Sequence, residues 1–224
     1  MLRVILWKIG CEWAHLKRAF WPRLDRKTYY FAFGANLCRD VLELRRIRIF
    51  DEFDFALENA ELRFSQPGFY RQHGYASADA ADGKVVYGKM YLILERDAER
   101  MDYFEGVPFL RAHEKVYRET DGFEFYFYRT TRIVEGLKPT REYLDYIVDA
   151  YRQMPIVPAT HLALLRDTEV LERYLPMDET GLFVSDIGRW PALLHPLLIR
   201  YERLCSGAVE VVWHRSPLQW LIRV

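Results

Sequence analysis

The stretch that decides the fold runs from Thr28 to Leu37 and reads Thr-Tyr-Tyr-Phe-Ala-Phe-Gly-Ala-Asn-Leu. Its aromatic residues favour a β-strand, and Gly34 can adopt backbone angles that other residues avoid, so the stretch predicts a strand that ends in a turn. Asn36 is predicted to cap a following helix, whose apolar residues recur at helical spacing: Leu37, Val41 and Leu44. Unpaired N–H groups at such a junction suit a carboxylate or an oxyanion.

A second segment, Glu95 to Val107, predicts a short helix with Asp97 as its N-cap and Gly106 as its stop. The apolar stripe of this helix is Ala98, Met101 and Phe104. Helical spacing places Glu105 on or beside that stripe, where loss of water would raise the pKa of its carboxyl group, as a general acid/base requires. The alternative is that Glu105 turns to water at the helix end or pairs with an arginine.

The residues Phe33-Gly34-Ala35-Asn36-Leu37 resemble the Tyr-Gly-Ser-Asn-Leu signature of the γ-glutamylcyclotransferase (AIG2-like) family. Three further blocks follow in the family's order: Glu61 to Gly68, Val85 to Val107 with Met101-Asp102-Tyr103-Phe104-Glu105-Gly106-Val107, and Leu137 to Thr140 with Tyr143. The resemblance covers residues 27 to 167.

The resemblance implies roles for individual residues. Glu105 matches the family's catalytic acid/base. The implied substrate-binding residues are those of the turn and one later tyrosine: Phe33, Gly34, Ala35, Asn36, Leu37 and Tyr143. Phe33 and Ala35 replace a tyrosine and a serine, so two hydroxyl groups of the family are missing here. A tyrosine that follows Glu-Gly-Val in some relatives has no counterpart at positions 111 to 113.

These residues predict a cofactor-free γ-glutamylcyclotransferase-like enzyme. The α-amine of a small γ-glutamyl amide attacks its own γ-carbonyl and releases 5-oxoproline and an amine or amino acid, so the substrate supplies the nucleophile. Two alternatives stay open. One is another acyl transfer or amide hydrolysis on the same scaffold, and the other is a non-catalytic domain for ligand binding or assembly.

Composition narrows the choice of partners and compartment. Lysine plus arginine total 32 and aspartate plus glutamate total 32, so no net charge attracts nucleic acid or anionic lipid. Three widely separated cysteines (Cys11, Cys38 and Cys205) indicate a reducing compartment, and we expect a cytoplasmic protein. The six histidines show no i, i+4 pair, so the sequence predicts no metal site.

The fold class predicted for residues 27–174 is α+β, a small mixed β-barrel flanked by helices. Residues 50–93 are rich in strand-forming residues, with turn signals at 66–68, 73–74 and 82–83. Aromatic residues alternate from Phe123 to Tyr128 after a turn at 121–122, which predicts a hairpin. Helices are predicted from Arg141 to Arg152, capped by Thr140, and from Thr160 to Tyr174.

Two extensions flank this domain. Residues 1–26 have the spacing of an amphipathic helix, and residues 175–224 contain the apolar cluster Leu193 to Ile199. We expect the extensions to pack together, on the domain, or on a second subunit of a homodimer. A less favoured alternative is contact with a membrane surface through the three tryptophans of the first extension: Trp7, Trp13 and Trp21.

Overall fold

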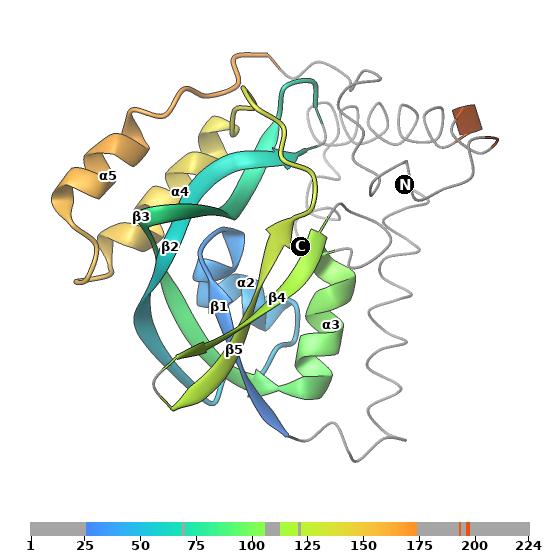
Figure 1. Ribbon diagram of the computed structural model, residues 1–224, viewed down its shortest axis with the longest axis vertical. Coiled ribbons are helices and arrows are strands. Elements are labelled where there is room, and N and C mark those ends of the chain that lie inside the picture. Colours follow the sequence, from blue (N-terminus) through green and yellow to red (C-terminus); the bar gives the residue numbers. More distant parts are fainter. Residues whose placement is uncertain are drawn as a thin grey trace.

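The computed structural model describes residues 26–68, 70–105, 113–120 and 122–173, together with positions 193, 196 and 197 (Figure 1). The predictions for the two extensions, and for Gly106 as the stop of a helix, lie outside these residues. The division of the chain into three parts therefore stays a prediction.

The described strands form one mixed five-stranded sheet with the order β2-β3-β1-β5-β4 (Figure 1). The strands are β1 (Lys27–Ala32), β2 (Asp51–Pro67), β3 (Gly74–Leu94), β4 (His113–Thr120) and β5 (Phe123–Thr130). β1 and β5 run parallel, and the other pairs are antiparallel. The predicted α+β class is confirmed. The predicted closed barrel is wrong, because β2 and β4 are unpaired edges in the described part of the sheet.

The long β2–β3 pair explains one further difference from the sequence prediction. The expected turn at 82–83 is a bulge within β3, because the pairing steps from Glu58↔Val85 to Ala60↔Ala80 without reversing the chain. Gly83 has a φ of +70°, and its N–H donates to the Asn59 side chain over 3.0 Å. The turn signals at 66–68 and 73–74 do mark the connection between the two strands.

The sheet has two buried faces of different chemistry. Alternation along β5 places Phe125 and Phe127 on one face with Phe31 of β1, and Tyr126 and Tyr128 on the other. The phenylalanine face is covered by α4 (Arg141–Arg152) and α5 (Ala159–Arg166). The tyrosine face is covered by α3 (Glu95–Glu105). The alternation predicted from the sequence is confirmed.

Helix ends follow local hydrogen bonding. Thr140 caps α4 as predicted, since its Oγ1 accepts from the Tyr143 N–H at 3.2 Å. α5 is shorter than predicted because the chain turns back after it, and the Leu171 N–H donates to the Pro139 carbonyl. Asp97 is not an N-cap. β3 leads directly into α3 at Glu95, which leaves Asp97 buried within the first turn.

Candidate active site

The turn after β1 consists of two short helices, η2 (Ala35–Leu37) and α2 (Arg39–Leu44). The first backbone hydrogen bond of η2 runs from the Leu37 N–H to the Gly34 carbonyl at 3.0 Å. The N–H groups of Ala35 and Asn36 precede that bond and have no acceptor within the helix. The turn therefore has two backbone donors that make no hydrogen bond within η2.

Asn36 does not cap a helix, and that expectation is wrong. Its buried side chain instead joins three elements. Nδ2 donates to the Tyr30 hydroxyl at 2.6 Å and to Oε1 of Glu105 at 3.0 Å, while Oδ1 accepts from Arg45 at 2.7 Å. Because a guanidinium can only donate, this last bond fixes which way round the amide lies. The Asn36 amide therefore directs its Nδ2 donor group to the Glu105 carboxylate.

Glu105 is the last described residue of α3, and its side chain is only 12% exposed. Oε1 accepts from Arg45 Nη1 at 3.1 Å as well as from Asn36. The sequence alternative of an arginine partner is thus the one observed, but the carboxylate stays mostly buried. Burial disfavours the charged form of the carboxylate, whereas the guanidinium and the amide favour it.

Arg45 was missed in the sequence analysis. It follows α2 directly, its side chain is 11% exposed, and its guanidinium lies 4.8 Å from the centre of the Phe104 ring. The Arg45 carbonyl accepts from Arg100 Nε at 2.6 Å, which ties its backbone to α3 as well. Arg45 lies nine residues after Asn36, a spacing that neither a helix nor a strand pattern would single out. Only the tertiary fold brings the two side chains together.

His113 was also missed as a site residue. It opens β4, is 5% exposed, and its Nδ1 lies 3.2 Å from the Glu105 carbonyl oxygen and 3.6 Å from Oε2. The sequence analysis noted only that no tyrosine occurs at positions 111 to 113. A histidine at the edge of that gap was the available signal.

Two buried tyrosines, Tyr30 and Tyr91, contact the residues of the turn. Tyr30 stacks on Tyr126 with ring centres 5.2 Å apart, and burial, followed by the charge of Glu105, raises the pKa of Tyr30 well above its ordinary value. Tyr30 is therefore a neutral phenol under ordinary conditions. Tyr91 is wholly buried, and its hydroxyl donates to the Leu37 carbonyl at 2.7 Å, which anchors the turn.

Tyr143 reaches the same turn from α4. Its hydroxyl accepts from the Ala76 N–H at 3.3 Å. A Cβ atom added to Gly34 would lie 3.1 Å from that hydroxyl, so the absence of a side chain at Gly34 permits the close approach. Tyr143 thus lies against Gly34 while Glu105 binds Asn36, and the turn connects the two.

The remaining predicted contacts differ in exposure. Phe33 and Leu37 are 6% and 2% exposed, and their side chains lie in the core. Contact between these two residues and a ligand would therefore come from their backbone. Ala35 is half-buried. The structure brings Gly34, Asn36, Glu105 and Tyr143 together. The side chains of Phe33 and Leu37 lie in the adjoining core.

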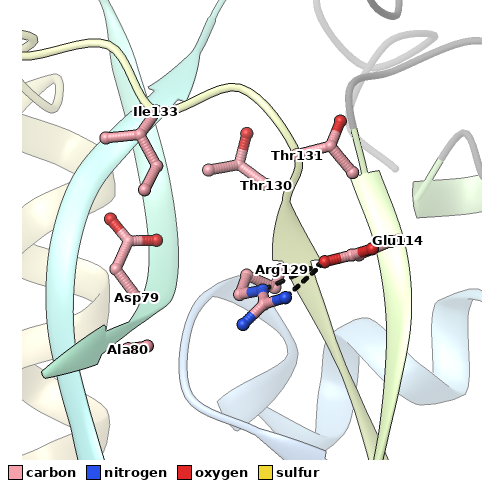
Figure 2. Close-up of a pocket in the computed structure, with 7 residues that line it drawn as sticks. All are labelled: Asp79, Ala80, Glu114, Arg129, Thr130, Thr131 and Ile133. Carbon is pink, nitrogen blue, oxygen red and sulfur yellow. Dashed lines mark hydrogen bonds and ion pairs between the residues drawn. The ribbon is translucent and has the colours of Figure 1, made fainter.

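A surface hollow of about 430 Å³ lies between β3 and the open end of the β4–β5 hairpin, opposite its turn (Figure 2). Its lining residues are Asp79, Ala80, Glu114, Arg129, Thr130, Thr131 and Ile133. The charged side chains already have partners: Arg129 binds Glu114 at 2.6 Å, and Asp79 accepts from the hydroxyls of Ser65 and Ser77, each at 2.6 Å. Thr130 pairs with His113 in the sheet, so the hollow adjoins the strand that carries His113.

The described residues lack two features that would indicate other kinds of function. No group of three His, Cys, Asp or Glu side chains in this part of the chain is placed to hold a metal ion. No helix of the described residues has both the length and the apolar character needed to cross a bilayer.

Comparison with solved structures identifies the fold. A structure titled "Gamma-glutamyl cyclotransferase" matches 69% of this chain and 95% of its own, with a TM-score of 0.55 and 19% identity. An uncharacterized protein from Homo sapiens matches the same shares with a TM-score of 0.54 and 21% identity. YkqA from Bacillus subtilis matches 70% of this chain and 57% of its own, with a TM-score of 0.53 and 16% identity.

No family model and no curated protein matches the sequence. The structural matches nevertheless define the class: an α+β protein with the mixed sheet of the γ-glutamyl cyclotransferases. The resemblance drawn from the four sequence blocks is confirmed at the level of the fold.

Proposed function

We propose that the protein is a γ-glutamylcyclotransferase-like enzyme that needs no cofactor. One observation carries the proposal: Asn36 of the turn donates to the carboxylate of Glu105 at 3.0 Å. These residues lie 69 positions apart and belong to the two blocks that the family resemblance pairs as substrate-binding loop and acid/base. Tyr143, from a third block, lies against Gly34 of the same turn.

The proposed reaction requires one proton carrier. The α-amine of a γ-glutamyl amide attacks its γ-carbonyl carbon, a C–N bond forms, and Glu105 takes the proton that the amine loses. The bond to the leaving nitrogen then breaks, and Glu105 returns the proton to that nitrogen. The products are 5-oxoproline and a free amine or amino acid.

The residues around Glu105 have distinct parts in this scheme. Arg45 and Asn36 both bind Oε1, so the carboxylate is held in one orientation before the substrate arrives. The N–H groups of Ala35 and Asn36 are suited to the oxyanion that develops on the γ-carbonyl. Tyr143 is suited to contact the glutamyl part of the substrate, because its hydroxyl lies beside Gly34.

The test is product identification. The protein is incubated with a panel of γ-glutamyl amino acids and γ-glutamyl amines, and the products are analysed by mass spectrometry. We expect 5-oxoproline, with a rate that neither EDTA nor Cys38→Ala changes, since neither a metal nor an enzyme thiol takes part. Free glutamate would instead indicate attack by water on the same scaffold, and binding without any product would favour the non-catalytic alternative.

A further inference from the structure

His113 contacts the proposed acid/base at two points. It is 5% exposed, and its Nδ1 lies 3.2 Å from the main-chain carbonyl oxygen of Glu105 and 3.6 Å from the carboxylate Oε2 of the same residue. His113 lies on β4, and β1 leads into the turn. In the sheet, β5 lies between these two strands. The contact therefore reaches Glu105 independently of Asn36 and Arg45.

The chemistry of these two neighbours assigns a hydrogen to Nδ1. A carbonyl oxygen and a carboxylate oxygen are both acceptors, so Nδ1 serves them only as an N–H donor. The carbonyl belongs to Glu105, the last described residue of α3, so the His113 ring binds the main chain and the side chain of the same residue.

Ionisable groups surround the His113 ring from α3, β4, β5 and the residue that follows α2. α3 contributes Glu105 and also Asp102, which accepts from the Tyr128 hydroxyl at 2.6 Å. β5 contributes Tyr128, whose ring stacks near that of His113 with centres 6.2 Å apart. The same strand as His113 contributes Lys115, which is paired with Asp102. Arg45 binds the other carboxylate oxygen of Glu105.

We propose that His113 is a positioning residue of this site, which holds Glu105 at its carbonyl and its carboxylate and links the carboxylate to a second ionisable group. The kinetic part of this proposal rests on the proposed function. When the ring gains its second proton, the imidazolium stabilises the ionised carboxylate and weakens it as a proton acceptor. Titrations of the two groups are then coupled, and the pH dependence belongs to the pair.

The first test needs no enzyme activity. Ring ¹⁵N spectra of the full chain are recorded across pH, and the His113 signal is assigned by its loss in His113→Asn. We expect Nδ1 to be protonated in the neutral ring and the pKa of His113 to fall by about one in Glu105→Gln, because an opposite charge is removed. Glu119→Gln, at the far end of β4 and exposed, is the control and should leave this pKa unchanged.

The second test separates positioning from a merely structural cap. Asparagine keeps an N–H donor near the place of Nδ1 but does not titrate, whereas alanine keeps neither property. We expect His113→Asn to retain the unfolding temperature, to lose about tenfold in kcat/KM, and to lose one ionisation from the acid limb of its pH profile. His113→Ala should lose stability as well.

The outcomes distinguish the two proposals. A neutral ring protonated on Nε2, an unchanged His113 pKa in Glu105→Gln, or a His113→Asn enzyme with parental kcat/KM and pH profile would each overturn the positioning role. Failure of the parent protein to turn over any γ-glutamyl compound would overturn the proposed function, and the spectra alone would then decide whether His113 and Glu105 form a coupled pair.

Discussion

The two faces of the sheet are built from the same strands but hold different chemistry. On one face, Phe31, Phe125 and Phe127 pack with the apolar side of α4. On the other, Tyr30 and Tyr126 pack with the apolar stripe of α3. Each face buries aromatic rings, so each contributes hydrophobic stabilisation. The strand rings of the tyrosine face add hydroxyl groups, and those of Tyr30 and Tyr128 reach Asn36 and Asp102.

This difference explains why the proposed acid/base lies where it does. The rings of Phe31, Phe125 and Phe127 offer no hydrogen-bond donor, so a carboxylate placed against them would be costly to bury. On the tyrosine side, Glu105 finds Asn36, which Tyr30 holds in place, and Arg45. The phenylalanine rings thus stabilise the fold, while Tyr30 on the tyrosine face also orients Glu105 through Asn36.

The largest effect on stability is expected on the phenylalanine face. Phe127 is 2% exposed and contacts the rings of Phe31 and Phe33, so Phe127→Ala leaves a cavity and should lower the free energy of unfolding by about 4 kcal/mol. Denaturant unfolding measures the loss. Turnover per folded molecule should fall far less, and an equal loss of both would contradict the separation of the two faces.

A somewhat smaller loss is expected for Arg45→Met. This change keeps much of the buried side chain but removes the cation from Glu105, and a buried charge left without its partner costs about 3 kcal/mol. Arg39→Met is the matched control, since Arg39 is 55% exposed and its pairs with Glu43 and Glu52 lie at the surface. Equal unfolding midpoints for the two variants would show that the pair with Glu105 does not stabilise the fold.

The smallest effect is expected for Tyr128→Phe, which removes one hydrogen bond to Asp102 and should cost about 1 kcal/mol. Tyr117→Phe, at an exposed ring, is its control. Burial raises the pKa of Tyr30, Tyr126 and Tyr128 well above the ordinary value.

These raised pKa values also predict a response to alkali. The unfolded chain ionises its tyrosines near pH 10, whereas the folded tyrosine face does not, so this stability is complete below about pH 10 and is lost as the pH rises further. Unfolding midpoints measured from pH 8 upwards should fall less steeply in Tyr128→Phe than in the parent. An identical slope would mean that Tyr128 is not part of the alkaline response.

Much of this architecture could be predicted from local sequence. The alternation in β5, the Thr140 cap and the apolar stripe of α3 each depend on residues close together in the chain. The bulge at Gly83 could not be predicted, because the same Asp-Gly pair suits a hairpin turn and only the pairing with β2 decides between them.

The site was predictable in part for the same reason. The family resemblance selected Asn36, Glu105 and Tyr143, and the fold brings all three to one turn. Arg45 and His113 belong to no quoted motif, and their contacts depend on how α2 and β4 meet the end of α3. Such contacts between distant segments follow from packing and leave no periodic pattern in the sequence.

The most direct test of the proposed site is the rate of 5-oxoproline formation by Glu105→Gln, with the best γ-glutamyl substrate of the parent. Glutamine keeps the shape of the side chain but cannot exchange the proton. In the proposed reaction Glu105 carries both proton transfers, so we predict a fall of about 10² or more in kcat, with the unfolding transition intact. A variant that forms 5-oxoproline as fast as the parent would contradict the account and leave Glu105 as a structural carboxylate.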